Sequence, residues 1–324
     1  MGSSNQLTAQ KQRFSVAITT DTYRNMISNT LGDPERSRRF IAAITSAVAV
    51  NPALQDCNPS TILAGALLGE SLNLSPSPQL GQYYLVPFEN RVKGKDGKAL
   101  YVTNEKGEKV LDEKGKWIPV TEKKAQFVLG FKGYIQLAIR SGQYKDIDVL
   151  TIKEGEYLGK DADTGKPRFR FIEDDDERDA LPTAGYLAYF EYLNGFKKSL
   201  YWSKAKMLNH ADQYSPAFSA QVMQKIESGE MPQADMWKYS SFWYKDFDSM
   251  AKKTMLRQLL SKWGMMSIEM QQGFVHDSQF IQMGNDGSFS GDYEEPAPVD
   301  PAPAEPQAAD QQPGEEAQIN LADL

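Results

Sequence analysis

The stretch SMAKKTMLRQLLSKW, residues 249–263, predicts the helix on which the fold depends. At about 100° per residue its large apolar side chains fall on one arc, as in an amphipathic helix that packs on a core. Lys253 and Arg257 are four residues apart and share a flank, which is typical of a surface pair. The apolar arc comprises Leu256, Leu259, Leu260 and Trp263.

Lys252 is the exception in this helix, because it projects near the middle of the apolar arc. A buried ammonium without a partner is costly, so the side chain must extend to solvent, pair with a carboxylate or face an anion. Asp246 and Asp248 are close enough in sequence to pair with it. A phosphate in a groove would satisfy it equally well.

Outward from this helix, the periodicity predicts a chain of both helices and short strands. N-terminal helices precede the strands, and the long helix above closes the core. Helices are expected over 20–31, 35–50, 60–73, 134–142, 203–213, 216–228 and 234–264. Strands are expected over 82–90, 125–133, 146–153, 167–172, 184–193 and 196–202.

Composition divides the chain into three parts. We expect a flexible N-terminus over 1–18, a core over 19–284 for binding and oligomerisation, and a disordered acidic tail rich in proline over 285–324. Within the core, three charged turns (KDGK, EKGE and EKGK) separate short apolar runs in 91–124. These turns predict a protruding β-ribbon.

Charge is segregated along the chain. The net charge is −7, but residues 285–324 hold ten acids and no base, so the first 284 residues carry 36 bases against 33 acids. A second acidic cluster, EDDDERD, occupies residues 173–179. A mildly basic body is therefore joined to an acidic tail, and the acidic isoelectric point does not exclude nucleic acid as a partner.

Several kinds of site are not expected. Two histidines and one cysteine give no metal site of useful spacing, and no run of 18 apolar residues could span a membrane. We predict no catalytic residue and no metal site. A divalent ion held by EDDDERD remains an alternative, although a solvated acidic loop is the simpler interpretation. A cytoplasmic protein is expected.

Bases and aromatic residues are mixed in two places, 123–142 and 236–262. Cations neutralise phosphates and flat rings stack on bases, so this mixture is typical of surfaces that bind single strands. Aromatic residues at helical spacing are also typical of a core, and that alternative stays open. The candidate residues from these stretches are Lys123, Lys124, Tyr134, Trp243 and Lys245.

Four stretches have a specific combination of residues. They are NPALQDCNPSTILAGALLGESLNLSPSPQLGQYYLVPF (51–88), FVLGFKGYIQLAIRSGQ (127–143), IKEGE (152–156) and MAKKTMLRQLLSKW (250–263). Together they span residues 51 to about 270, and in content and order they resemble the RecT family of phage single-strand annealing proteins. This resemblance implies an α+β fold, in which a β-hairpin and small antiparallel sheet pack on helices.

This resemblance implies a protein that binds single-stranded DNA and anneals complementary strands in homologous recombination. It implies assembly into rings or helical filaments, no ATP and no other cofactor, with Mg²⁺ as a modulator of DNA binding. By position, the GFKG and AKKT segments imply DNA contacts in a basic groove. The implied contacts are Lys132, Arg140, Lys252, Lys253 and Arg257.

The expected partners are single-stranded DNA, the annealed duplex intermediate and further copies of the chain. A host single-strand-binding protein or a phage exonuclease could bind the tail, and a phage- or prophage-encoded protein in a bacterial cytoplasm is expected. Two rival functions remain: a metal-dependent nuclease that uses the acidic loop, and a structural assembly protein. The 91–124 ribbon and the acidic loop are departures from the family pattern, so the resemblance assigns them no role.

Overall fold

Capping residues determine where two of the N-terminal helices begin. Pro34 opens helix α3 (Pro34–Val50), where the Asp33 side chain accepts a hydrogen bond from the Glu35 amide at 2.8 Å. Asn58 caps helix α4 (Pro59–Ser71) in the same way. Residues 61–69 of α4 are all buried, so this helix forms the centre of the N-terminal layer. Helix α2 (Asp21–Leu31) and the 3-10 helix η1 (Pro52–Asp56) complete the layer.

In this computed structural model the described residues are 13–94, 96–215, 217–239, 241–283 and 288–292. Most of the expected flexible N-terminus and acidic tail lies outside them. Helix α1 (Phe14–Ala17) lies inside, and Phe14 is buried in the main core. Within the segment expected to be loose up to residue 18, residues 14–17 are therefore helical, and Phe14 and Ile18 are buried in the main core.

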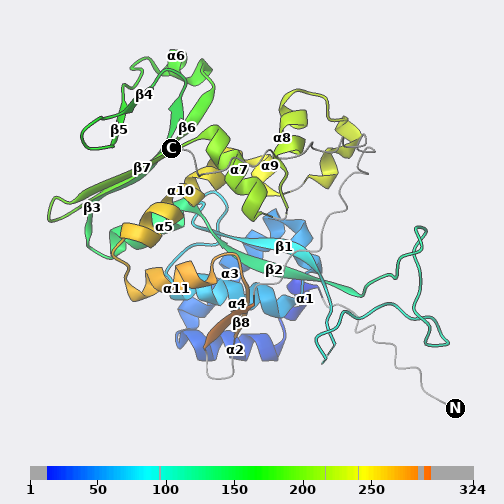
Figure 1. Ribbon diagram of the computed structural model, residues 1–324. Coiled ribbons are helices and arrows are strands. Elements are labelled where there is room, and N and C mark those ends of the chain that lie inside the picture. The colour runs from blue at the N-terminus through cyan, green and yellow to red at the C-terminus, as the bar shows by residue number, and fades with distance from the viewer. Residues whose placement is uncertain (1–12, 95, 216, 240, 284–287, 293–324) are drawn as a thin grey trace, which may run out of the picture.

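The first sheet is the predicted hairpin. Strands β1 (Tyr83–Arg91) and β2 (Thr121–Leu129) pair antiparallel with Tyr83 opposite Leu129. Strand β2 ends earlier than the expected 125–133, because helix α5 (Phe131–Arg140) begins after Gly130. One face of this sheet lies on α4 (Figure 1).

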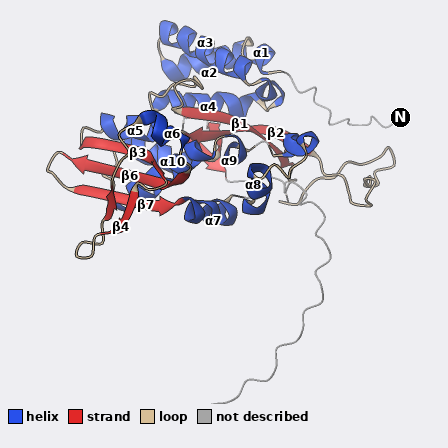
Figure 2. Cartoon of the chain, turned by 90° about the horizontal axis from the view of Figure 1, so that it is seen from above, coloured by secondary structure: helices blue, strands red, loops and turns tan. Residues whose placement is uncertain are grey.

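The second sheet has the order β3-β6-β7 and is antiparallel throughout. Helix α10 (Phe247–Trp263) packs across it and also contacts α5 (Figure 2). A small β4-β5 hairpin and helix α6 lie beyond its edge. The elements are β3 (Tyr144–Lys153), β4 (Tyr157–Lys160), β5 (Pro167–Phe169), α6 (Asp175–Ala180), β6 (Thr183–Tyr192) and β7 (Lys197–Ser203).

The single helix expected over 234–264 is three elements: η2 (Gln233–Lys238), α9 (Phe242–Lys245) and α10 (Phe247–Trp263). The final break falls at Asp246, whose backbone is not helical (φ −151°, ψ 74°). Its side chain accepts a hydrogen bond from the Ser249 amide at 3.0 Å. Asp246 therefore starts a new helix, because N-cap geometry competes with helix continuation.

The remaining elements follow or precede α10. Helices α7 (Lys204–Tyr214) and α8 (Ala220–Glu227) lead from β7 towards it, and helix α11 (Ile268–His276) follows it. Strands β8 (Phe280–Met283) and β9 (Phe289–Asp292) pair with each other. Just before β8, Gln279 forms an antiparallel bridge with Phe127 of β2, so the end of the core returns to the first sheet.

Residues 92–120 project from the end of the β1–β2 hairpin (Figure 1). They form three short hairpins, with bridges between Lys93 and Ala99, Thr103 and Lys109, and Leu111 and Trp117. We call this segment the three-hairpin knob. The segment expected to be a protruding β-ribbon with three turns is here a cluster of hairpins rather than one long pair.

These elements make the fold α+β, with small antiparallel sheets packed on helices, as predicted. In the part of the chain that the structure describes, none of the helices has the length and apolar character needed to cross a membrane.

Candidate functional site

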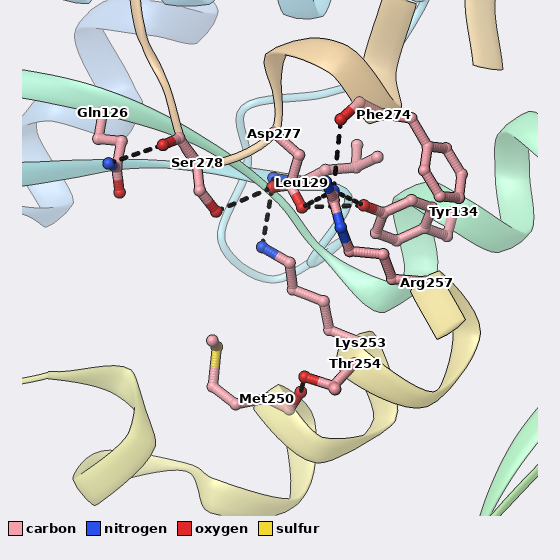
Figure 3. Close-up of polar contacts among 10 residues, drawn as sticks. All are labelled: Gln126, Leu129, Tyr134, Met250, Lys253, Thr254, Arg257, Phe274, Asp277 and Ser278. Atoms are coloured by element: carbon pink, nitrogen blue, oxygen red, sulfur yellow. Dashed lines mark hydrogen bonds and ion pairs between the residues drawn. The ribbon is translucent and has the colours of Figure 1, made fainter. Parts of the chain in front are cut away.

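Asp277 is the centre of a buried polar network (Figure 3). One carboxylate oxygen, Oδ1, accepts hydrogen bonds from Lys253 Nζ at 2.8 Å and from the Leu129 amide at 2.9 Å. The other oxygen, Oδ2, accepts from the Tyr134 hydroxyl and from Arg257 Nη1, both at 2.8 Å. The network thus ties together β2, α5, α10 and the segment after α11.

The network changes the interpretation of the lysine pair in α10. Lys253 is 7% exposed and is the buried cation, whereas Lys252 is partly exposed. Arg257 is paired with Asp277, so Lys253 and Arg257 are not a simple surface pair as the spacing indicated. The helix is packed on more than one side, by α5 and by the β3-β6-β7 sheet. The prediction from a single apolar arc therefore identified Lys252, rather than Lys253, as the lysine that faces the core.

Burial opposes ionisation of Asp277, but the charges of Lys253 and Arg257 and the hydrogen bonds outweigh it and lower the pKa of the carboxyl. Burial also lowers the pKa of Lys253, against the attraction of Asp277. Burial and the neighbouring Asp277 raise the pKa of Tyr134 well above its usual value. Tyr134 is therefore a neutral donor in this network, and its ring lies 4.8 Å from that of Phe274.

Trp243 is buried as well. Its ring lies 5.7 Å from Phe218 and 5.2 Å from Phe247, within an aromatic cluster under α9 and α10. The alternative that aromatic residues at helical spacing form core describes Trp243 correctly. Its neighbour Phe242 is 37% exposed and contacts the ring of Tyr84 at 5.5 Å.

The GFKG segment requires its two glycines because the backbone of the turn before β1 lies very close to them. A Cβ on Gly130 would lie 2.1 Å from the carbonyl oxygen of Gly81, and one on Gly133 would lie 2.1 Å from that of Gln82. Neither position has room for a side chain. The two glycines hold the start of α5 against the turn before β1, and Lys132 between them is exposed.

Exposed cations and rings meet where α5 and α10 come together. The stem of Lys132 and the hydroxyl of Tyr84 both lie beside Gly81. Lys252 Nζ lies 5.8 Å from the centre of the Phe131 ring, next in sequence to Lys132. We call this set the α5–α10 surface. It consists of Tyr84, Phe131, Lys132, Phe242 and Lys252, and the exposed Lys245 follows Phe242 by three residues on α9.

Lys252 also lines an open polar hollow between α10 and β3, together with Lys153 and Arg178. Among the described residues it forms no ion pair. Of its two expected acidic partners, Asp246 caps α10 and Asp248 accepts a hydrogen bond from the Tyr186 hydroxyl. Asp179 and Asp248 line the same hollow, and Arg178 is paired with Glu156, so the hollow has mixed charge.

The ten predicted site residues do not converge on one trough. Lys132 and Lys252 lie on the α5–α10 surface, and Lys245 is exposed on α9. Tyr134, Trp243 and Lys253 are buried, while Arg257 is 41% exposed and bound to Asp277. Arg140 lies at the far end of α5, where it donates to the Asn73 carbonyl. Lys123 pairs with Asp56 at 3.5 Å, and Lys124 follows it on β2 near the knob.

Sequence reasoning missed Tyr84, Phe131 and Lys153. Tyr84 could have been found from strand alternation, because Tyr83 and Leu85 are buried and the side chain between them must face the other way. Phe131 and Lys153 were inside the quoted GFKG and IKEGE segments, but no periodicity distinguished them.

Residues of the acidic cluster 173–179 cap a helix and form an ion pair. Asp174 caps α6 by accepting from the Glu177 amide, and Arg178 pairs with the buried Glu156 at 2.6 Å. In the ranges that the structure describes, there is no group of three or more His, Cys, Asp or Glu residues that could hold a metal ion.

Comparisons with known proteins agree with the sequence resemblance. The model of the RecT family matches residues 38–288. The uncharacterized protein YqaK of Bacillus subtilis (strain 168) is 31% identical over 245 residues, which cover 76% of this chain and 66% of that protein. Protein RecT of Escherichia coli (strain K12) is 28% identical over 120 residues, 37% of this chain and 35% of that protein. The matches thus span just under two thirds of the first relative and about a third of the second.

Proposed function

The chain belongs to the RecT family, and from that premise we propose that it binds single-stranded DNA and anneals complementary strands in homologous recombination. The observation that carries the proposal is the α5–α10 surface, where Lys132 and Lys252 flank exposed or half-buried aromatic rings. This combination of side chains suits a strand whose phosphates need cations and whose bases need flat partners.

Each part of the surface has a physical role. Lys132 and Lys252 hold the phosphate backbone, since neither forms a salt bridge within the described residues. Lys245 adds a third cation on the one-turn helix α9. Phe242, resting on Tyr84, offers a ring edge or face to an unpaired base, and such stacking contributes about 1–3 kcal/mol per base.

The buried network supports this surface from below. Asp277 fixes Lys253 and Arg257 of α10 against Tyr134 of α5, so the two helices that carry Lys252 and Lys132 keep their relative position. Direct DNA contact by Lys253, Arg257, Tyr134 and Trp243 stays a prediction. The role that their geometry supports is to position the contacting side chains.

Annealing needs no nucleotide hydrolysis, because base pairing supplies the free energy. Stacking in a duplex averages about 1.4 kcal/mol per step. The protein must lower the barrier that repulsion between phosphates and folding of each strand impose. Contacts to phosphate carry no sequence information, so binding is expected to tolerate any sequence and to weaken with salt.

One subunit contacts few nucleotides, so we propose that copies assemble along the strand as a ring or helical filament, which multiplies weak contacts. ATP and other cofactors have no part in the proposal, and Mg²⁺ acts only by modulating DNA binding. The proposed location is a bacterial cytoplasm. The proposed partners are the annealed duplex intermediate and a phage exonuclease or host single-strand-binding protein.

The first prediction tests the surface itself. Replacing Lys132 and Lys252 together by alanine should weaken binding of a labelled oligothymidylate about tenfold at low salt, because two phosphate contacts are lost. The slope of log K against log salt should become shallower by up to about 1.4, since each single-strand contact contributes about 0.7. Fluorescence anisotropy across a salt series measures both.

The matched control removes two lysines elsewhere. Lys145 and Lys197 both pair with Glu191, so Lys145→Ala, Lys197→Ala has the same change in charge away from the surface. It should bind like the unaltered protein. Equal binding by both double variants would reject the α5–α10 surface as the interface. Shortened strands after incubation with Mg²⁺ would instead support a nuclease.

A further inference from the structure

The three-hairpin knob has a regular internal arrangement. Three backbone hydrogen bonds form a closed triangle: Val92 donates to Val120, Val120 to Leu100 and Leu100 to Val92, each at 2.8 Å. A second triangle links Val102, Ile118 and Val110. The three hairpins are therefore related by an approximate threefold arrangement, and each supports the other two.

The three hairpin tips are built alike. Each has a glycine with a positive φ, at Gly97, Gly107 and Gly115, where an L side chain would be strained. In each tip that glycine donates to the carbonyl three residues earlier, at 2.9–3.0 Å. This regular, hydrogen-bonded backbone therefore holds the side chains of the knob in defined positions.

One side of the knob carries an aromatic pair held by a lysine. The rings of Tyr101 and Trp117 lie 5.5 Å apart, and Lys109 Nζ lies 4.5 Å from the first and 4.1 Å from the second. Trp117 is nevertheless 52% exposed. The lysine fixes the ring on one face, which leaves the rest of an ordered indole in contact with solvent.

A shallow hollow lies beside this pair. It is lined by Arg91, Tyr101, Gly115, Lys116, Trp117 and Pro119. Among the described residues that line it there is no carboxylate. Its two cations, Arg91 and Lys116, form no salt bridge with any residue in the described ranges. Two rings and two cations without acidic partners thus border one small space at the exposed end of the molecule.

We propose that this hollow is a second binding site for single-stranded DNA, distinct from the α5–α10 surface, in which one unpaired base stacks on Trp117. Arg91 and Lys116 neutralise the phosphates on either side of that base. This inference rests on the proposed function, because it takes the same ligand, but it assigns that ligand to a segment for which the family resemblance gives no role.

The chemistry of the hollow favours a nucleotide over a protein partner. A nucleotide combines a flat ring with an anion, and the hollow offers rings and cations side by side. The knob also exposes Leu100, Val102 and Leu111, which would suit an apolar protein surface. Those three apolar residues do not line the hollow, whereas the cations Arg91 and Lys116 do.

The test uses the full chain with Trp117→Ala and Trp117→Phe, and a fluorescein-labelled oligothymidylate as probe. Loss of the ring should weaken binding about tenfold, and phenylalanine should restore most of it, since stacking needs only a flat ring. Lys106→Ala is the matched control, because Lys106 is an exposed cation on another tip that does not line the hollow. It should bind like the unaltered protein.

A second readout locates the contact. Ultraviolet cross-linking to an oligonucleotide that contains iodouridine should label the peptide with Trp117 in addition to peptides of α5, α9 or α10. Binding by Trp117→Ala equal to that of the unaltered protein, with no cross-link in 92–120, would overturn the proposal. Unchanged binding with a smaller assembly by mass photometry would also overturn it, and would make the knob a contact between subunits.

The two proposals fail in different ways. If the Lys132, Lys252 variant binds normally while Trp117→Ala binds weakly, the α5–α10 surface is rejected and the knob site stands. If the order is reversed, the knob site alone is rejected. A folded Trp117→Ala protein is expected, because the knob lies outside the main core, and its thermal unfolding midpoint checks this.

Discussion

Asp277 is the counterion of two cations on α10. Two cations of that helix, Lys253 and Arg257, both bind its carboxylate, and Tyr134 and the Leu129 amide use its remaining lone pairs. A buried ion pair contributes little by itself, but removal of one partner leaves a charge unpaired in the core. The residue is therefore expected to matter for stability out of proportion to its size.

Asp277→Asn should lower the free energy of unfolding by about 3–5 kcal/mol, because Lys253 is buried and loses its counterion. Denaturant unfolding at pH 7 measures the change. Asp163→Asn is a control that makes the same chemical change at an exposed turn residue, and it should have little effect.

The unaltered protein and Asp277→Asn should become more similar in stability at acidic pH. The pKa of Asp277 is lowered in the folded state, so its stabilising contribution is present above the unfolded value of about 3.9. That contribution is lost as the pH falls through the lower, folded value. The difference between Asp277→Asn and the unaltered protein should therefore shrink below pH 4. A difference that stays constant down to pH 2 would contradict this account of the network.

The burial of Lys253 rather than Lys252 shows what spacing within one helix leaves undetermined. The four-residue interval between Lys253 and Arg257 correctly placed both on one side of α10. What lies on that side depends on Asp277, which follows a different helix and reaches α10 only through tertiary packing. No local pattern in 249–263 contains that information.

At the scale of elements, Asp246 decides where α10 begins and hence which way Lys252 points. Asp246→Ala should lower the free energy of unfolding by about 1 kcal/mol, because the Ser249 amide loses its cap. Asp246→Asn keeps a capping oxygen and should retain most of the stability. Chemical denaturation of the two variants side by side measures this. Equal losses in both would show that the charge of Asp246, rather than its cap, is what stabilises the helix.

Element type was largely predictable where periodicity was strong. The capped helices α3 and α4, the β1–β2 pair and the β6–β7 hairpin around Gly195 were all predicted within a few residues. The break at Asp246 was not, because an aspartate within an aromatic and basic stretch gives no strong stop signal. Of the predicted site residues, Lys132 and Lys245 are exposed and Lys252 is partly exposed, and their contact with DNA stays a prediction.

At the scale of the whole molecule, charge is divided between a mildly basic body and an acidic C-terminal segment. Truncation after Asp292 removes eight acids and no base and keeps β9. Annealing should be retained, and oligonucleotide binding at low salt should become slightly tighter, because long-range repulsion is reduced. Anisotropy at low and high salt measures the change. Loss of binding after truncation would mean that the tail contributes to the interface.

The bond between Asp277 and the Leu129 amide joins residues 148 positions apart, and that between Gln126 and Ser278 joins residues 152 apart. On the ribosome, most of the polypeptide must emerge before either can form. Until then α10 carries two cations with no counterion, and β2 has one edge without its bridge to Gln279. Nascent chains stalled just before residue 277 should therefore be the species most in need of chaperone protection, since closure of the core waits for its final segment.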